Sequence, residues 1–425
     1  MGVGGAGVSA LARVFLARGD DVSGCDAKAS DTTDALAAAG VKIKFGHDAE
    51  HVLFQDLLVY SGAIKGSPEL DAARAMGLNV LSRAEMLAEL INDSDSIAVA
   101  GTAGKTTVTH MLGHILVTAG YDPTVLVGDG SSARAGRSRW LVAETDESDG
   151  TLTLHHPRRA IVTNIELDHP DHFRDVSAVR DLFQWFIANL PQDGLAVICA
   201  DDDLARALKP AATRVTYGFR QDATYRSEPV RPFPIYHGGA ELGRINLIQP
   251  GRHNIQNATG AAAMALEIGV PFAGVAAALE TFPGAHRRME LLGVFQGAAV
   301  YDDYAHHPTK VRAAIDAARE LRHRRLIVVF QPHRYSRLAA LMHDFTRAFD
   351  GADKVLVLDV YSAGEDNPSG VQASDLAHQI RGATYAGDFK TAIEMLEGLA
   401  GPGDLLLLMG AGDINKLGDE LAHRV

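Results

Sequence analysis

One short motif has the residue types and spacing that phosphate chemistry needs. Gly101–Thr107, which reads Gly-Thr-Ala-Gly-Lys-Thr-Thr, follows the apolar run Ile97–Ala100 and precedes a helical stretch. In a strand–turn–helix context, backbone N–H groups cradle phosphates, a lysine neutralises the β and γ oxygens, and a threonine hydroxyl binds Mg²⁺. Val99 stands where the usual pattern has its first glycine. The alternative, a Gly-Lys-Thr turn without a ligand, fits this context less well.

Acidic residues follow two later apolar strands. Val142–Asp149 contains four carboxylates, and Thr163–His169 ends in Glu, Asp and His. Acids at strand carboxyl ends beside a phosphate loop lie where Mg²⁺ ligands belong. Each cluster alone would be typical of a solvated loop with helix caps, but their place after Lys105 favours a metal site.

The first residues form a weaker motif. Gly2–Gly7 matches G-x-G-x-x-G and enters a helix, and Asp26 lies where a Rossmann unit places its ribose-binding acid. The pattern suits a nucleotide diphosphate but does not separate NAD from a UDP-sugar, and a helix–strand packing turn is the alternative. The strand expected before the turn is either truncated or very short, because the sequence begins at Met1.

Two further polar runs close apolar strands near the end of the chain. They are Asp302–Pro308 and Gln331–Arg337. Open α/β sheets bind ligands at the carboxyl ends of strands, so both runs point toward one crevice. Their arginines could hold a carboxylate with two hydrogen bonds. For each histidine-containing run, helix capping or core filling is the alternative.

Strand-sized apolar runs alternate with helical stretches along the chain, which predicts parallel α/β architecture. We expect three α/β domains in series: residues 1–94, Rossmann-like; residues 95–283, a central P-loop ATPase-type parallel sheet; and residues 284–425, a Rossmann-like doubly wound sheet. The polar stretch Asn92–Ser96 is predicted to be a linker. Asp222–Gly243, rich in Pro, Arg and Gly, is predicted to be a small irregular or β insertion.

Composition narrows the function classes. With 40 Lys and Arg against 53 Asp and Glu, the net charge of −13 argues against a nucleic-acid partner. Cys25 and Cys199 lack metal-ligand spacing, which argues against a disulfide framework and a structural zinc. Neither a membrane span nor a signal peptide is apparent, so a cytoplasmic protein without a membrane partner is expected.

Taken together and in this order, these motifs resemble the Mur ligases over nearly the whole chain. Within that family the chain is most similar to the members that add L-alanine. The segments that carry the resemblance are Gly2–Gly7, Arg83–Leu87, Gly101–Thr107, Ala143–Asp149, Thr163–His169, Gly251–Asn257, Asp302–Thr309, Gln331–Arg337, Asp359–Glu365 and Gly410–Asp413. The pair Asp302–Thr309 and Gln331–Arg337 is the most specific part.

The resemblance implies an ATP- and Mg²⁺-dependent ligase of peptidoglycan synthesis that acts on UDP-N-acetylmuramate and L-alanine. The lactyl carboxylate attacks the γ-phosphate of ATP, and the amine of alanine attacks the resulting acyl phosphate. By motif match, the UDP-sugar would contact Gly4, Gly5, Ala6, Gly7 and Asp26. ATP would contact Gly101, Thr102, Gly104, Lys105, Thr106, Thr107, Asn254, Asn257 and Arg288, and the metal ligands would be Thr106, Glu144 and His169. Alanine would be bound by Tyr304, His306, Arg334 and Arg337, and the catalytic residues would be Lys105, Glu144, His169, Arg288, Asp302 and His306.

Two departures from the family pattern are visible. Ala103 replaces a histidine in the phosphate loop, and the basic turn before the third domain reads Ala-His-Arg-Arg-Met at residues 285–289. The alternatives are a recycling ligase that attaches a murein tripeptide to UDP-N-acetylmuramate, a non-catalytic nucleotide-binding regulator, and an NAD-dependent dehydrogenase. The dehydrogenase would leave Lys105 and Glu144 without a role. Amino-acid selectivity and oligomeric state are not determined by the sequence.

Overall fold

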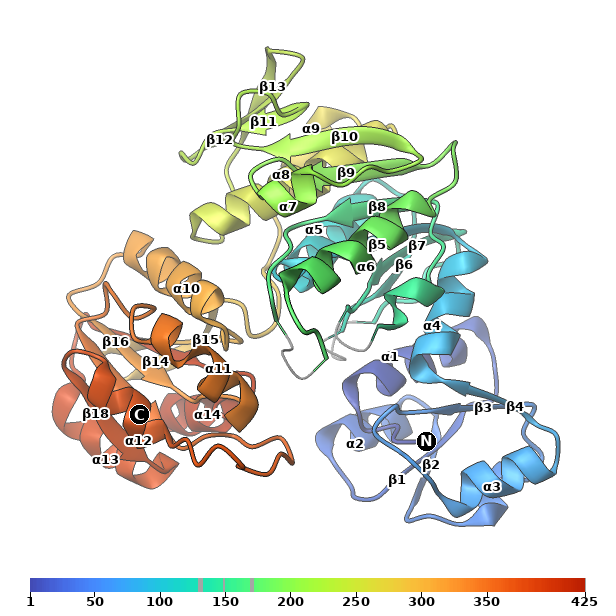
Figure 1. Ribbon diagram of the computed structural model, residues 1–425, viewed down its shortest axis with the longest axis horizontal. Coiled ribbons are helices and arrows are strands. Elements are labelled where there is room, and N and C mark those ends of the chain that lie inside the picture. The colour runs from blue at the N-terminus through green and yellow to red at the C-terminus, as the bar shows by residue number, and fades with distance from the viewer. Residues whose placement is uncertain (129–132, 148–149, 169–171, 425) are drawn as a thin grey trace. The chain divides into compact units, whose positions relative to one another are not determined.

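The computed structural model describes residues 1–128, 133–147, 150–168 and 172–424, so the predicted metal ligand His169 lies outside the described residues. The chain forms two compact units, which are described separately (Figure 1). The larger unit comprises Met1–Glu166, Val176–Asn246 and Asn257–Phe282. The smaller unit comprises Leu167–Asp175, Leu247–Gln256 and Pro283–Val425.

The first part of the larger unit is built on two pairs of parallel strands, β1 with β2 and β3 with β4. Residues 1–3 lie between the pairs: the N–H groups of Gly2 and Val3 donate to the carbonyl of Cys25, and Ser61 donates to the carbonyl of Met1. Residues 1–3 form no regular strand, but these hydrogen bonds place them where that strand was expected. The elements are α1 (Ala6–Arg18), β1 (Ser23–Asp26), α2 (Asp31–Ala38), β2 (Lys42–Phe45), the 3₁₀ helix η1 (Ala49–Val52), β3 (Leu57–Tyr60), α3 (Pro68–Ala75), β4 (Asn79–Ser82) and α4 (Arg83–Asn92).

The predicted linker Asn92–Ser96 is much shorter than expected. Asn92 ends α4, and β5 (Asp95–Ala100) begins three residues later. The polar Ser96 is fully buried. It is the second residue of β5, a strand that pairs with β7 on one side and β8 on the other. The prediction of a linker over the whole stretch was wrong for this reason.

A large mixed sheet forms the centre of the larger unit. Within the described residues its order is β13-β12-β11-β10-β9-β8-β5-β7-β6, and the strands from β11 to β6 are parallel. The crossovers β5–α5–β6 and β8–α6–β9 run in opposite directions, so right-handed connections place α5 and α6 on opposite faces (Figure 1). The elements are α5 (Lys105–Thr118), β6 (Thr124–Leu126), β7 (Trp140–Glu144), η2 (Thr151–Leu154), β8 (Arg159–Val162), α6 (Val176–Ala188), β9 (Leu195–Cys199), α7 (Asp203–Arg206), β10 (Thr213–Gly218), β11 (Tyr225–Ser227), β12 (Phe233–His237), β13 (Ala240–Ile245), α8 (Arg252–Glu267) and α9 (Phe272–Glu280).

The predicted β insertion is confirmed. Strands β11, β12 and β13 fall inside or just beyond Asp222–Gly243 and extend the central sheet through antiparallel pairs. Pro234 lies within β12, and the pairing of β12 with β13 is interrupted by a register shift after Ile235. The insertion therefore lengthens the sheet away from the phosphate loop, which follows β5.

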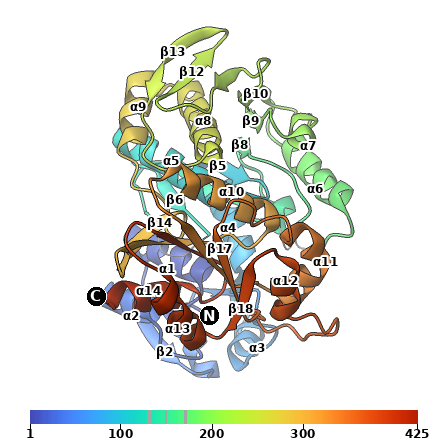
Figure 2. The ribbon, with the colours of Figure 1, turned by 90° about the vertical axis from the view of Figure 1, so that its left-hand side faces the viewer.

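The smaller unit has a doubly wound sheet, as predicted. Its described strands run in the order β14-β15-β19-β16-β17-β18, and only the edge pair β14–β15 is antiparallel. Figure 2 shows α11 and α12 on one side of β17 and β18, and α13 and α14 on the other. The elements are β14 (Glu290–Phe295), β15 (Ala298–Asp303), α10 (Pro308–Glu320), β16 (Leu326–Phe330), α11 (Tyr335–Phe345), β17 (Lys354–Leu358), α12 (Ala373–Gln379), β18 (Ala383–Gly387), α13 (Phe389–Leu399), β19 (Leu405–Met409) and α14 (Asn415–His423).

Alternation along β16 explains the two cores of this sheet. Val328 and Phe330 pack with α10, α11 and α12, whereas Ile327 and Val329 pack with α13 and α14. Successive side chains of a strand point to opposite faces, so a continuous apolar run serves both layers. The polar residues that follow β15 and β16 are thereby held at one edge of the sheet. Among the described helices, none is long and apolar enough to cross a bilayer.

Candidate functional site

The phosphate loop depends on two glycines. Gly101 has φ +139° and Gly104 has φ +87°, and Gly104 directly precedes α5. A Cβ atom on Gly101 would lie 2.0 Å from the Thr163 hydroxyl, and one on Gly104 would lie 2.6 Å from Asn257 Oδ1. Neither position accepts a side chain. The loop therefore presents bare backbone at the start of α5, where partial positive charge favours an anion.

A second strand end fixes the shape of this loop. The N–H of Thr102 donates to the carbonyl of Asn164 at 3.0 Å, and the N–H of Ala103 donates to Asn164 Oδ1 at 2.8 Å. The hydroxyl of Thr163 donates to the Ala103 carbonyl at 2.6 Å, and the Thr102 hydroxyl accepts from the N–H of Glu166 at 2.9 Å. Thr163, Asn164 and Glu166, which belong to a run predicted to bear ligands, thus hold the loop in place.

Lys105 is held by carboxylates. Its ammonium donates to Glu147 Oε2 at 2.6 Å and lies 3.8 Å from Asp146 Oδ1. Burial opposes the charge of Lys105, but Glu147, Asp146 and Glu144 raise its pKa above the ordinary value. The lysine is therefore charged at neutral pH. A phosphate that binds to Lys105 must compete with Glu147, a residue that the sequence analysis did not select.

Thr106 and Glu144, two of the expected metal ligands, are in contact. The Thr106 hydroxyl lies 3.1 Å from both Glu144 oxygens, and the N–H of Gly128 donates to Oε2 at 2.9 Å. Adjacent ligands of an octahedral Mg²⁺, with Mg–O of about 2.0–2.1 Å, lie about 3.0 Å apart. The spacing of these oxygens therefore fits a magnesium ion. Thr107 is buried one residue further along α5.

The N-terminal glycine turn is organised by Asp26. The N–H of Gly4 donates to Asp26 Oδ2 at 2.8 Å, and a Cβ on Gly4 would lie 3.0 Å from that oxygen. A Cβ on Gly7 would meet the Arg83 side chain at 2.3 Å. Gly5 is the residue before α1, and Ala6 is its first residue. The turn, Asp26 and Arg83 are therefore brought together, as the motif order predicted for Gly4 and Asp26.

In the smaller unit, Asp302 is paired with Arg287. The Nε of Arg287 donates to Asp302 Oδ2 at 2.8 Å, and the same guanidinium donates to the carbonyls of Gly410 and Gly412. Sequence analysis selected Arg288, whose guanidinium lies 5.1 Å from the centre of the Tyr304 ring. Sequence analysis did not select Arg287, because two adjacent arginines in a turn carry no signal for which one pairs with Asp302.

His306 is buried and neutral. Burial lowers its pKa well below the ordinary value, with Lys310 and Arg337 acting in the same direction. Its Nδ1 lies 2.7 Å from the Tyr304 carbonyl, so Nδ1 carries the proton and Nε2 a lone pair. His306 also packs edge-on against the Tyr304 ring. The predicted pair Tyr304 and His306 is therefore one structural group, with a base on its second nitrogen.

The two predicted arginines have different environments. Arg337 is buried, and its guanidinium donates to Asp168 Oδ1 at 2.9 Å. Asp168 also pairs with Lys310 at 3.0 Å. Arg334 is partly exposed, lies 3.6 Å from Glu365 and precedes α11 with φ +68°. A non-glycine residue at this φ is strained, and such strain is common at ligand sites.

The two predicted adenine-side asparagines both lie on α8. Asn257 approaches the phosphate loop at Gly104, as described above, and Asn254 donates to the carbonyl of Pro250 at 2.7 Å. Both side chains are largely buried. One helix thus carries two amides at the spacing that the motif predicted.

Comparison with known proteins gives these sites a context. Residues 1–95 match the Mur ligase family catalytic domain, residues 99–265 match the Mur ligase middle domain, and residues 287–412 match the Mur ligase glutamate ligase domain. The UDP-N-acetylmuramate–L-alanine ligase of Solibacter usitatus is 41% identical over 100% of this chain and 94% of that protein. The chain belongs to the Mur ligase family. The enzyme of the same name from Aquifex aeolicus is 40% identical over 100% of this chain and 97% of its own.

Solved structures of Mur ligases have the same architecture. The UDP-N-acetylmuramate–alanine ligase MurC of Thermotoga maritima has a TM-score of 0.81 at 27% identity, covering 100% of this chain and 97% of that one. A murein peptide ligase from Psychrobacter arcticus has a TM-score of 0.74 at 25% identity, covering 99% and 96%. This Mur ligase therefore has three domains in series, as predicted.

Proposed function

We propose that this Mur ligase joins L-alanine to the lactyl carboxylate of UDP-N-acetylmuramate, with hydrolysis of ATP to ADP and phosphate. The observation that carries the proposal is the identity of about 40% over the whole chain to ligases named for that reaction. Among the solved structures, the UDP-N-acetylmuramate–alanine ligase has a TM-score of 0.81, against 0.74 and 0.61 for two murein peptide ligases. The L-alanine reaction is therefore favoured over the recycling reaction.

The reaction needs a leaving group, because a carboxylate and an amine do not condense in water. A carboxylate oxygen attacks the γ-phosphorus and ADP leaves; the alanine nitrogen then attacks the acyl carbon and inorganic phosphate leaves. Lys105 supports the first step by neutralising charge on the β and γ oxygens, provided that it exchanges Glu147 for phosphate. Mg²⁺ held by Thr106 and Glu144, with His169 as a further expected ligand, would supply additional positive charge at these oxygens.

The second step needs a base and an orienting group. Alanine arrives as an ammonium and must lose a proton before its nitrogen can attack. His306 presents a lone pair on Nε2 and would accept this proton, and a bound carboxylate or phosphate near it would have to offset the burial, Lys310 and Arg337 that lower its pKa. The exposed guanidinium of Arg334 suits the alanine carboxylate, because a charged donor there orients the amine. Arg337 would not contact alanine directly, because its guanidinium pairs with Asp168. It would instead help to hold the segment that carries Arg334.

The remaining assignments follow the same proposal. The UDP diphosphate would lie at Gly4, Gly5, Ala6 and Gly7, with Asp26 at the uridine side, and the adenine would lie beside Asn254 and Asn257. Arg288 and Asp302 would close on the nucleotide. The domains that carry these groups would span residues 1–94, 95–283 and 284–425. The carboxylate of Asp26 is already engaged by Gly4, so Asp26 would shape the turn as well as contact the ligand.

The proposal is tested by ADP release in reactions that contain Mg²⁺, ATP and UDP-N-acetylmuramate, with L-alanine, L-serine, glycine or the murein tripeptide as acceptor. We expect release that requires both the UDP-sugar and L-alanine. ADP release with the tripeptide, and not with L-alanine, as acceptor would identify a recycling ligase. Nucleotide binding without release under any combination would identify a regulator.

A further inference from the structure

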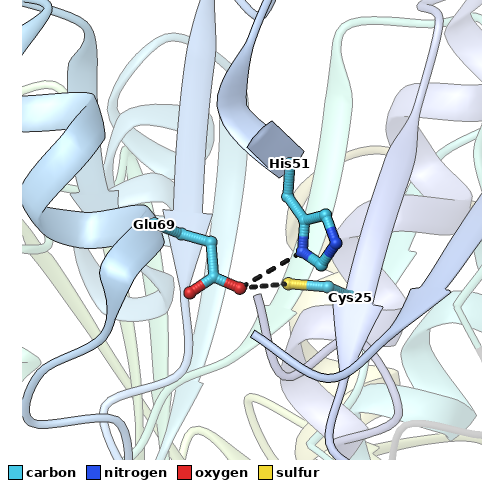
Figure 3. Close-up of side chains that lie close together, drawn as sticks. All are labelled: Cys25, His51 and Glu69. Atoms are coloured by element: carbon cyan, nitrogen blue, oxygen red, sulfur yellow. Dashed lines mark hydrogen bonds and ion pairs between the residues drawn. The ribbon is translucent and has the colours of Figure 1, made fainter. Parts of the chain in front are cut away.

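Three ligand-type side chains meet in the first part of the larger unit, away from the phosphate loop. Cys25 lies in β1, His51 in η1 and Glu69 in the first turn of α3. Figure 3 shows the three side chains pointing toward one another from these separate segments. Their ligand atoms all lie within 4.8 Å of one another. A fourth candidate, His47, follows β2 and reaches the same carboxylate.

The contacts converge on one oxygen of Glu69. Its Oε1 lies 3.2 Å from Nδ1 of His47, 3.2 Å from Nδ1 of His51 and 3.7 Å from Sγ of Cys25. The N–H of Asp48 donates to the same oxygen at 3.1 Å. The second oxygen, Oε2, is buried and has no hydrogen-bond partner among the described residues. Oε1 thus has several polar neighbours, whereas the burial of Oε2 costs free energy that no hydrogen bond offsets.

The distances from Glu69 Oε1 agree with those edges of a tetrahedral metal site that meet at one ligand atom. With Zn–N and Zn–O of about 2.0–2.1 Å and Zn–S of about 2.3 Å, neighbouring ligand atoms lie about 3.3 Å apart for N and O and about 3.6 Å for S and O. The observed spacings are 3.2 Å and 3.7 Å. Hydrogen bonds do not require two imidazoles and a thiol to gather at one carboxylate oxygen. A bound cation, in contrast, requires the lone pairs of its ligands to point toward one position.

The charge of the cluster also favours a cation. The side chain of Glu69 is fully covered, and its Oε1 accepts the N–H of Asp48. The His47 side chain is 41% exposed and gives an ion a route from solvent.

We propose that Cys25, His51 and Glu69 form a binding site for a thiophilic divalent cation of the zinc class. Binding converts the Cys25 thiol to a thiolate that bonds to the metal, and the thiol proton passes to solvent. No redox change occurs. The sequence argued against a structural zinc because its cysteines have no ligand spacing; these ligands come from three separate segments, and only the fold brings them together.

The position of the site indicates what the ion would do. The carbonyl of Cys25 accepts the N–H groups of Gly2 and Val3, and the next residue, Asp26, accepts the N–H of Gly4. A metal bound to Cys25 would therefore fix the strand that holds the N-terminal glycine turn. The ion would stabilise this part of the chain rather than take part in bond formation.

The test is titration of the full, reduced, metal-free protein with Co²⁺ in excess Mg²⁺, which occupies oxygen-only sites. We expect one Co²⁺ per chain with a near-ultraviolet thiolate-to-metal absorption band, its displacement by Zn²⁺, and release of a proton. The variants Cys25→Ser and His51→Gln should each lose the band and weaken binding by about 100-fold or more. Cys199→Ser is the matched control, because Cys199 is a second buried free cysteine, and it should keep the band.

The outcomes distinguish a metal site from a cluster that is held together only by hydrogen bonds to Glu69. A titration without the thiolate band, or a band that persists in Cys25→Ser, would overturn the proposal. Loss of the band in Cys199→Ser would do the same. A further variant, Glu69→Gln, should also lose the band. If it fails to fold, Cys25→Ser still tests the proposal, because serine replaces only sulfur by oxygen. The unfolding midpoint of Cys25→Ser without metal shows whether that variant is folded.

Discussion

The ammonium of Lys105 and the carboxylate of Glu147 lie 2.6 Å apart, and their side chains are 12% and 3% exposed. The lysine belongs to the start of α5, and the glutamate follows β7. In the nucleotide-free protein this pair keeps the lysine charged and in place. It also sets a cost for ATP, because the phosphates must replace Glu147 as partner.

Replacing Lys105 by alanine should abolish turnover. Loss of the charge that offsets the β and γ oxygens is expected to reduce kcat by about 10²–10³ or more, as for other electrostatic contacts to a transition state. ATP binding should weaken as well. ADP release and nucleotide titration measure the two effects, and Lys390→Ala, which removes an exposed lysine, should behave as the wild type. Full activity of Lys105→Ala would show that the loop does not bind phosphate in the reaction.

Replacing Glu147 by glutamine should strengthen ATP binding. The competing charge is lost, and a buried lysine without its counter-charge gains more from phosphate. We expect the Kd for ATP to fall by about tenfold, equivalent to about 1.4 kcal/mol, while the unfolding temperature of the nucleotide-free protein falls. Calorimetric titration and thermal unfolding without nucleotide measure these changes. Weaker ATP binding would mean that Glu147 contacts the nucleotide or its metal directly.

Replacing Arg334 by alanine should separate the two half-reactions. Loss of a charge-assisted pair with the alanine carboxylate costs about 1.5–3 kcal/mol, which is roughly a ten- to hundredfold weaker apparent affinity for alanine. Acyl-phosphate formation, trapped by borohydride reduction, should survive while amide formation fails. Equal loss of both steps would show that Arg334 serves ATP or holds the loop through Glu365.

Arg337→Ala gives the contrasting result. Its guanidinium pairs with the buried Asp168, so its removal leaves this interior carboxylate with less compensating charge, since Lys310 still pairs with it. Breaking a buried pair so that no partner remains costs about 3–5 kcal/mol; with Lys310 in place we expect a smaller loss, and the unfolding temperature should fall. Arg334→Ala, at a partly exposed position, should leave it almost unchanged. The comparison separates a positioning arginine from a substrate-contacting one.

His307 should make the protein less stable as the pH falls below neutrality. Burial lowers the pKa of His307 from 6.5 to about 4. Between these values the unfolded chain binds a proton that the folded chain does not, so the free energy of unfolding decreases as pH falls from 6.5 toward 4. The shift corresponds to a loss of up to about 3 kcal/mol. In His307→Gln this part of the slope should disappear in denaturation measured across that pH range, whereas the exposed His343→Gln should retain it.

Local patterns were sufficient to predict the phosphate loop and most of the strands. The apolar run before Gly101, the glycines and the helix after Lys105 are neighbours in the chain, so propensity and turn chemistry act on them directly. The same holds for β19, whose apolar run was predicted with its observed bounds. The alternation of strands and helices likewise predicted parallel α/β domains.

Pairings between distant residues could not be predicted in this way. Arg337 meets Asp168 across 169 positions, and Cys25 meets Glu69 across 44. Which strand ends share a sheet edge, and which of Arg287 and Arg288 pairs with Asp302, depends on packing that produces no periodic pattern in the sequence. The residue types at the site were therefore determined by the sequence alone. Their partners, charge states and mutual distances were decided only by the tertiary structure, because electrostatic and metal-ligand contacts act through space rather than along the chain.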